Sequence, residues 1–199
     1  MVALTAGGFL IAPGESARYF GDLIWQTGRV GATDAIANQS LAGLLARAAG
    51  TATAPTGWWL AASLLILVAG LYRARAAHLD GDEIAALALV GLTANLISPM
   101  SWTHHLVFLP VAVLVLTDVA LRNRDPLPGA AALAGYALSV VSPIWLVPEH
   151  PAGARALILP NAFTLILVAL VVAMPHRRGP HGRWTTGAPS CHPVIDHRP

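Results

Sequence analysis

The stretch Ser98–His105, Ser-Pro-Met-Ser-Trp-Thr-His-His, lies between two apolar runs of the chain. Its proline ends a helix, because proline lacks the backbone N–H that a helix interior needs. Its tryptophan is typical of a membrane–water interface, and its two adjacent histidines bring polar chemistry to that boundary. We therefore predict that this stretch turns the chain back at one face of a bilayer and forms half of a polar site. The other half is predicted at Asn38-Gln39-Ser40.

The composition favours a membrane protein over a soluble one. Of the 199 residues, 55% are apolar and 11% are charged, and the mean hydropathy is +0.61. Soluble domains carry about 25% charged residues, so the deficit is large. Net charge is only +2, and no arginines interleave with aromatic residues in a patch, so nucleic-acid binding has little support. The single cysteine, Cys191, cannot form an internal disulfide, and no zinc-type spacing surrounds it.

The hydropathy pattern predicts an all-α, polytopic helical bundle. Residues 13–56 carry charges throughout, so we predict a long outer loop there. Amphipathic helices at Ala17–Gln26 and Ala35–Ala49 would lie on the membrane surface or pack on neighbouring spans. Val2–Ile11 is too short to cross a bilayer alone and is predicted to be part of a spanning helix whose first part is absent. The predicted bundle thus has about five full spans and a partial one. The full spans are Gly57–Tyr72, Ile84–Ile97, His105–Leu121, Gly129–Val147 and Leu157–Met174.

The arginines predict the orientation of this bundle, because cytoplasmic loops are rich in basic residues. Eight of the twelve arginines lie in alternate connectors and in the tail. We therefore predict a membrane domain at residues 1–175, followed by a cytoplasmic, disordered polar tail at residues 176–199. The eight are Arg73, Arg75, Arg122, Arg124, Arg177, Arg178, Arg183 and Arg198. The segments that then share the outer face are 13–56, 98–104 and 148–156.

Polar side chains on the predicted outer face supply a candidate binding site. Amides and hydroxyls such as those of residues 38–40 suit a polyhydroxylated ligand, because they offer both donors and acceptors. Adjacent histidines on a helix point about 100° apart, so His104 and His105 suit phosphate or sugar better than a shared metal. No metal site and no cofactor is predicted. The candidates for substrate contact are Asn38, Gln39, Ser40, Arg47, Ser101, Trp102, His104 and His105.

Structural roles stay open for several of these residues. Interfacial histidines also bond to loop carbonyls, and Arg47 either holds a phosphate or extends to water. A helix expected to begin near Ser101–Thr103 would attract an anion, although serine capping alone also satisfies its amides. Asn95 is expected to bond to a neighbouring helix or to form the floor of the site. The outer carboxylates do not pair with a histidine at helical spacing, so no general base is identified.

Together, Asn38-Gln39-Ser40-Leu41-Ala42-Gly43, Arg47 and Ser98–His105 resemble glycosyltransferase family 87, and Tyr19-Phe20 and Arg29-Val30-Gly31 resemble its outer loop. These are actinobacterial membrane mannosyltransferases of the GT-C superfamily, α-(1→2)-specific where known. The resemblance covers about residues 1–175 and implies the C-terminal half of such an enzyme. It implies a polyprenyl-phosphate mannose donor and a glycolipid or lipoglycan acceptor. Transfer is expected on the outer face, with inversion at the anomeric carbon.

The resemblance also implies a missing catalytic residue. In GT-C enzymes an aspartate in the first outer loop deprotonates the acceptor, and neither Asp22 nor Asp34 matches that position. We therefore expect a truncated chain with little transferase activity, or one piece of a split enzyme whose other half is a separate chain. Two alternatives stay open. One is a non-catalytic lipid-binding or transporter-like membrane subunit, and the other is a histidine-dependent redox or metal protein.

Overall fold

A computed structural model of the protein describes residues 2–23, 26, 29–147 and 157–177. These residues are mainly helical, and they contain no β-strand beyond one isolated bridge between Asn38 and Trp102. The predicted all-α class is thus confirmed. The helices are α1 Val2–Ile11, α2 Pro13–Gly21, α3 Leu41–Ala49, α4 Thr56–Leu79, α5 Glu83–Ile97, α6 Phe108–Asn123, α7 Pro126–Val141 and α9 Ala162–Ala173. Short 3₁₀ turns lie between some of them, at η3 Thr103–His105, η4 Pro143–Leu146 and η5 Leu159–Asn161.

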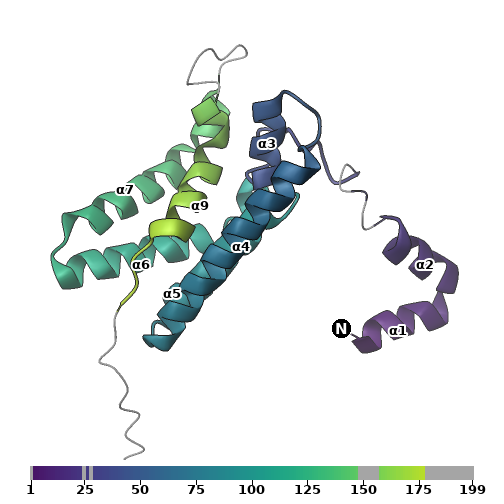
Figure 1. Ribbon diagram of the computed structural model, residues 1–199, viewed down its shortest axis with the longest axis horizontal. Helices are drawn as coiled ribbons and strands as arrows, with labels where there is room; N and C mark the ends of the chain where they lie inside the picture. The colour runs from purple at the N-terminus through teal and green to yellow at the C-terminus, as the bar shows by residue number, and fades with distance from the viewer. Residues whose placement is uncertain (1, 24–25, 27–28, 148–156, 178–199) are drawn as a thin grey trace, which may run out of the picture.

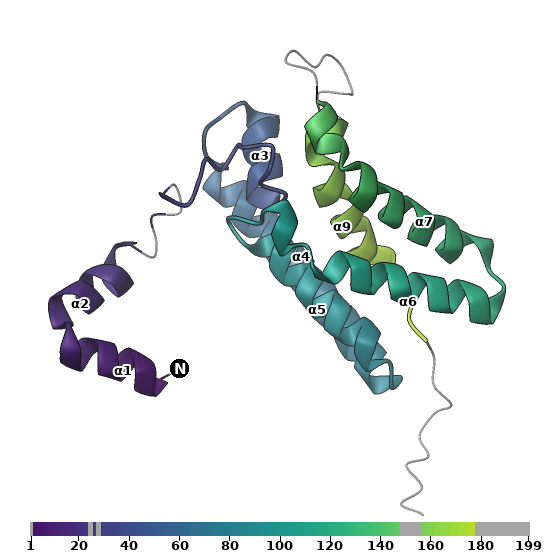
Figure 2. The ribbon, with the colours of Figure 1, turned by 180° about the vertical axis from the view of Figure 1, so that it is seen from behind.

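The helices from α3 onward form a bundle around the antiparallel pair α4 and α5 (Figure 1). Helix α9 packs against both members of this pair, and α6 and α7 form a hairpin that contacts α5 through α6. Helices α1 and α2 pack on each other and lie apart from the bundle in both views (Figures 1 and 2). The core of the bundle is therefore built by α4, α5, α6 and α9.

Small residues allow α5 to approach both α4 and α6 closely. A Cβ at Gly70 would lie 2.0 Å from Oγ1 of Thr93, and a Cβ at Gly91 would lie 2.2 Å from the ring of Phe108. Both glycines therefore mark places where side chains from a neighbouring helix fill the space of a missing methyl group. Such small-residue contacts are typical of helices that associate within lipid, where backbones must pack without a hydrophobic driving force.

Proline positions explain where the helices depart from the predicted spans. Helix α6 begins at Phe108 instead of His105, because Pro110 fits only in the first turn of a helix. Helix α7 ends at Val141 instead of Val147, because Ser142 takes a left-handed conformation (φ 46°) and Pro143 follows. In contrast, α4 continues past Tyr72 to Leu79, since the chain meets no proline or glycine before Gly81.

The two helices predicted in the outer loop also differ from the prediction. Helix α3 begins at Leu41, not Ala35, because Ser40 caps it and the preceding residues form a loop. Its buried side chains face α4 and α5, which favours packing over membrane-surface binding. Helix α2 ends at Gly21, and residues 24, 25, 27 and 28 of the predicted outer loop lie outside the described residues.

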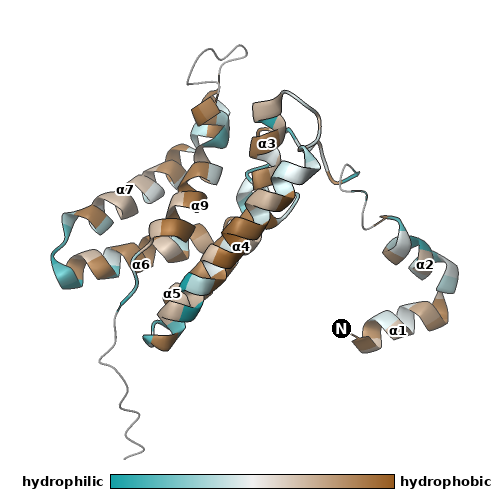
Figure 3. Cartoon of the chain, viewed as in Figure 1, coloured by the Kyte–Doolittle hydropathy of each residue, from teal (hydrophilic) through white to brown (hydrophobic). Residues whose placement is uncertain are grey.

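Among the described helices, only α4 is long and apolar enough to cross a membrane. It has 24 residues, whereas a span needs about 20. The other predicted spans correspond to helices of 12–16 residues, so the multi-span arrangement stays a prediction. Figure 3 shows apolar residues along α4 and α9 and polar residues at the turns. The outer side of α4 exposes Leu64, Leu65 and Val68, which is typical of a surface that meets lipid or another helix.

An ion-pair cluster closes the end of the bundle at the α4–α5 turn. Buried Asp82 caps α5 by accepting from the Ala85 amide at 3.2 Å. The same carboxylate accepts from the guanidinium of Arg177 at 2.9 and 3.2 Å. His176 lies 3.0 Å from Asp80. His176 and Arg177 are the first two residues of the predicted polar tail, and both form ion pairs with the α4–α5 turn. The rest of the predicted tail, 178–199, including Cys191, lies outside the described residues.

Replacing Asp82 with asparagine is expected to lower the free energy of unfolding by about 1.5 kcal/mol near neutral pH. Burial alone would raise the pKa of Asp82, but hydrogen bonds from Arg177 and the Ala85 amide lower it below its ordinary value. The contribution of the carboxylate is therefore complete above about pH 4 and is lost as the pH falls through the folded-state pKa. Unfolding in detergent near pH 7 and near pH 3 measures this change.

The difference in the free energy of unfolding between wild type and Asp82→Asn should be smaller near pH 3 than near pH 7. Asp125→Asn, at the exposed cap of α7, is the control and should have a smaller effect at both pH values. If this difference stayed constant down to pH 3, the ionised carboxylate of Asp82 would not be the source of the stabilisation.

Candidate functional site

Four segments distant in sequence meet at the end of the bundle opposite the Asp82–Arg177 cluster. They are the loop before α3, helix α3 itself, the turn 98–105 and the start of α9 at η5. The site and the Asp82–Arg177 cluster lie at opposite ends of the bundle because α5 begins beside Asp82 and ends at the turn. The prediction that residues 38–40 and the turn lie together is confirmed, because the backbone N–H of Gln39 donates to the Ser101 carbonyl at 2.7 Å.

Asn38 joins the loop before α3 to the turn. Its Nδ2 donates to the Thr33 carbonyl at 2.9 Å and to the Pro99 carbonyl at 3.2 Å. Its Oδ1 accepts from the amides of Ser40 and Ser101 at 3.3 and 3.0 Å. The side chain is fully buried, so its donors and acceptors are all used by the protein itself.

Gln39 joins the same loop to the start of α9. Its Nε2 donates to the carbonyls of Ile36 and Pro160 at 2.6 and 2.7 Å. Its Oε1 accepts from the Thr164 amide and hydroxyl at 3.2 and 3.3 Å. This side chain is also fully buried, and the bonds to Pro160 and Thr164 connect segments more than a hundred residues apart in the sequence.

Arg47 is the cation of this buried network. Its Nε and Nη2 donate to Oδ1 of Asn161 at 3.0 and 2.6 Å, and its Nη1 donates to the carbonyls of Ala35 and Asn38 at 2.6 and 2.9 Å. Burial lowers the pKa of Arg47 to about 10, and the charge of Asp34 opposes this shift. The guanidinium therefore stays charged at neutral pH, and neutral oxygens of the protein contact it.

Four of the predicted substrate contacts lie inside the protein. Asn38, Gln39, Ser40 and Ser101 are all buried, and their role as ligands stays a prediction. Ser40 caps α3 by accepting from the Gly43 amide at 3.2 Å. The amides of Asn38 and Gln39 satisfy backbone groups that the irregular loops leave unpaired, which gives them a positioning role.

Asn161 and Thr164 complete the network. In the sequence, only a weak signal points to Asn161 as a site residue, and no signal points to Thr164. Asn161 is buried and uses its Nδ2 to donate to the Leu157 carbonyl at 2.7 Å while Oδ1 receives Arg47. The signal that could have found them is a polar pair beside Pro160, at the start of an otherwise apolar helix.

The turn 98–105 does not begin a helix as predicted. Thr103–His105 form a 3₁₀ turn, and two of the backbone amides expected to attract an anion are used internally. The Ser101 amide donates to Asn38, and the Trp102 amide donates to Nδ1 of His105 at 3.3 Å. The α-helix expected at this turn begins only at Phe108, because Pro110 must lie in its first turn.

The exposed side of the turn carries its aromatic side chains. The His104 ring lies between the other two rings, with its centroid 5.5 Å from that of Trp102 and 4.3 Å from that of His105. Both histidines are exposed. Asn95 donates to the His105 carbonyl at 3.3 Å, as a support beneath the turn. Of the predicted substrate contacts, His104 and His105 are thus exposed, and Trp102 and Arg47 are half-buried.

An open cavity of about 330 Å³ lies beside the turn, between it and the helices α6, α7 and α9. Its polar lining comes from Thr103, His104, Ser139 and Ser142, and its apolar lining includes Phe163. Hydroxyls and an imidazole suit a phosphate or a sugar, and the apolar wall suits a hydrocarbon chain. Within the part of the chain that the structure describes, no group of three potential metal ligands occurs.

The fold and site thus define a helical protein with a largely apolar exterior and a polar cavity held at one end by buried loops. The family model of glycosyltransferase family 87 matches residues 1–99. The chain therefore resembles glycosyltransferase family 87 in sequence, as its motifs predicted.

Curated mycobacterial proteins are similar in sequence to this chain. Two are polyprenol-phosphate-mannose-dependent alpha-(1-2)-phosphatidylinositol mannoside mannosyltransferases. The one from Mycobacterium tuberculosis is 34% identical over 72% of this chain and 34% of its own length. The one from Mycolicibacterium smegmatis is 34% identical over 75% of this chain and 36% of its own length.

A third relative is named for a related acceptor. It is a polyprenol-phosphate-mannose-dependent alpha-(1-2)-phosphatidylinositol pentamannoside mannosyltransferase from Mycobacterium tuberculosis, 37% identical over 72% of this chain and 33% of its own length. The chain thus spans about a third of the length of the curated relatives it matches. No solved structure gives a significant match.

Proposed function

We propose that the chain forms part of a membrane mannosyltransferase that moves mannose from a polyprenyl-phosphate donor to a glycolipid or lipoglycan acceptor on the outer face. The observation that carries the proposal is the cavity beside His104, whose lining combines hydroxyls, an imidazole and an apolar wall. A polyprenyl-phosphate sugar has the matching parts, a sugar, a phosphate and a hydrocarbon chain. The relatives, which are named for dependence on such a donor, support the same assignment.

The proposed orientation follows from the two ends of the bundle. Arg73, Arg75 and Arg177 lie at the end of the Asp82–Arg177 cluster, and basic residues favour the cytoplasmic side. The cavity lies at the other end, where Trp102 suits an interface. Helix α4 has the length to join the two faces. We place the shorter apolar helices in the same bilayer, which gives a multi-pass protein with its C-terminus in the cytoplasm.

The role of the cavity is to bind and orient the donor. His104 and Thr103 would donate to the phosphate, which leaves with its polyprenyl chain when the acceptor oxygen attacks the anomeric carbon from the opposite side. That attack requires a base to take the acceptor proton, and no carboxylate lines the cavity among the residues that the structure describes. We infer that the base belongs to another part of the complete enzyme.

A transfer assay and a binding assay test this proposal together. The purified 199-residue chain should bind polyprenyl phosphate but should not transfer mannose from polyprenyl-phosphate mannose to a phosphatidylinositol mannoside. His104→Ala should weaken binding about tenfold, since it removes a hydrogen bond to a charged group. Thr117→Ala, on α6 outside this cavity, is the control and should leave the affinity unchanged.

The outcomes separate the assignments. Robust transfer by the chain alone would contradict the inference that the base lies elsewhere. An unchanged affinity for polyprenyl phosphate in His104→Ala would contradict the assignment of the cavity as the donor site. A non-catalytic lipid-binding or transporter-like subunit is the second candidate, favoured by the lack of a carboxylate in the described lining of the cavity. Adding the N-terminal part of a mycobacterial relative should restore transfer if the chain is part of an enzyme, and should restore none if it is such a subunit.

A further inference from the structure

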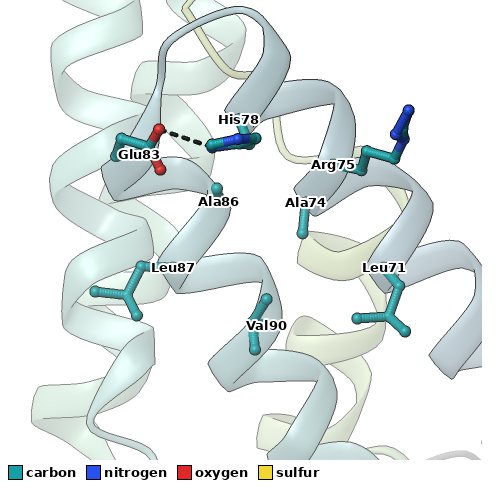
Figure 4. Close-up of a pocket in the computed structure, with 8 residues that line it drawn as sticks. All are labelled: Leu71, Ala74, Arg75, His78, Glu83, Ala86, Leu87 and Val90. Atoms are coloured by element: carbon teal, nitrogen blue, oxygen red, sulfur yellow. Dashed lines mark hydrogen bonds and ion pairs between the residues drawn. The ribbon is translucent and has the colours of Figure 1, made fainter.

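A second groove lies between α4 and α5 at the opposite end of the bundle from the cavity beside His104. Its volume is about 470 Å³, and residues of both helices line it. Figure 4 shows its two-part character, with Arg75, His78 and Glu83 near the α4–α5 turn and Leu71, Leu87 and Val90 further from the turn. The groove thus has a charged end and an apolar end.

The charged end carries one arginine, Arg75, that has no partner among the residues that the structure describes. His78 and Glu83 contact each other, with 2.7 Å between Nδ1 and Oε1, and Figure 4 shows Arg75 on the far side of His78 from Glu83. Arg75 makes no hydrogen bond or ion pair with any residue in the described ranges. By contrast, Arg122 pairs with Asp118 and Arg177 pairs with Asp82 at this same end of the molecule. Arg75 is therefore available to an external anion.

We propose that this groove binds an anionic glycerophospholipid of the cytoplasmic leaflet. The guanidinium of Arg75 donates to the lipid phosphate, and an acyl chain lies along Leu71, Leu87 and Val90. The proposal rests on the membrane placement given under the proposed function, but it concerns a different site. Basic pockets between helices on the cytoplasmic side are suited to such headgroups, because the leaflet there is rich in anionic lipid.

The arrangement favours a lipid over two other occupants. A small soluble anion would use Arg75 but would leave the apolar end exposed to water. An apolar helix of another chain would cover the apolar end but would bury an unpaired guanidinium, which is costly. A phospholipid satisfies both ends, since its phosphate and its acyl chain are joined at the distance that separates a bilayer surface from its hydrocarbon.

Native mass spectrometry of the full chain in detergent, titrated with phosphatidylglycerol or phosphatidylcholine, tests the proposal. The wild-type chain should prefer phosphatidylglycerol, and Arg75→Gln should reduce that preference about fivefold. Arg75→Lys keeps the charge and should retain most of the preference. The control Arg124→Gln removes an arginine that lies outside the groove at the α6–α7 turn, and it should leave the preference unchanged.

Three results would overturn the proposal. The first is an unchanged preference in Arg75→Gln, and the second is an equal loss in Arg124→Gln, which would indicate a general charge effect. The third is efficient cross-linking of the Leu87→Cys variant to a second copy in a Cys191→Ser background. Circular dichroism and size-exclusion chromatography establish that each variant is folded. The readout does not depend on polyprenyl phosphate, so this proposal and the transferase proposal can fail separately.

Discussion

Arg47→Ala is expected to lower the free energy of unfolding by about 3 kcal/mol, because the substitution leaves several buried acceptors unpaired. Oδ1 of Asn161 would lose two donors, and the carbonyls of Ala35 and Asn38 would lose one each. The loop before α3 would then lose part of its connection to α9. We expect the variant also to lose most of its affinity for polyprenyl phosphate, since the loop supports the turn that carries His104.

Unfolding of the chain in mixed micelles, followed by circular dichroism, measures this effect. Arg47→Lys should recover only part of the stability, because one ammonium group cannot reach all three acceptors. Arg18→Ala removes an exposed arginine of α2 and should change the stability by less than about 0.5 kcal/mol. If Arg47→Ala were as stable as Arg18→Ala, the network would not hold the site together. If instead Arg47→Ala were stable but failed to bind, Arg47 would be a direct ligand, as its sequence position first suggested.

Gly43→Ala is the second substitution with a large expected effect, a loss of about 2 kcal/mol. A Cβ at this position would lie 2.3 Å from the Asn38 carbonyl oxygen and 3.1 Å from both Asn38 Cγ and Arg47 Nη1. The carbonyl belongs to backbone that is held on both sides, so it cannot rotate away as a flexible side chain would. The helix would have to move off the loop, and the Gly43 bond to Ser40 would lengthen with it.

The same substitution elsewhere gives the matched control. Gly57 lies in the first turn of α4, and a methyl group added to it would have no other atom within 4 Å. Gly57→Ala should therefore be neutral or stabilising by up to about 1 kcal/mol. Both variants gain the same helical preference, and the difference between them isolates the steric clash. If Gly43→Ala and Gly57→Ala had equal unfolding midpoints in mixed micelles, α3 and the Asn38 loop would not be in close contact.

The sequence predicted the helices better than it predicted their ends. Long apolar runs indicate helices through composition alone, and α5 begins within one residue of its predicted start and ends at the predicted Ile97. Asp118 and Arg122, which are four residues apart on α6, form an ion pair at 2.8 Å, as that spacing favours. Helix ends depend on single residues such as Pro110 and Ser142, whose effect on the backbone is decided locally, so runs of apolar residues overestimated the lengths of α6 and α7.

The sequence predicted which polar segments meet, but it did not predict which groups each polar side chain contacts. Residues 38–40 and the turn were correctly placed together, because topology puts alternate connectors on one face. The amides were taken as ligands since polar side chains near a membrane often bind substrate, whereas the structure uses Asn38 and Gln39 to satisfy loop backbone. Sequence alone does not show which backbone groups an irregular loop leaves unpaired. It therefore could not distinguish a polar group that faces a ligand from one that replaces a missing helical bond.

The bonds from Gln39 to Pro160 and Thr164 also bear on the order in which the molecule forms. They close a segment of more than a hundred residues, and closing so long a loop costs conformational entropy that local helix formation does not. Helices α3, α4 and α5 can form from nearby contacts, but the loop before α3 obtains its last partners only when α9 arrives. The cavity beside His104 is therefore one of the last features to assemble during synthesis, after nearly the whole bundle is in place.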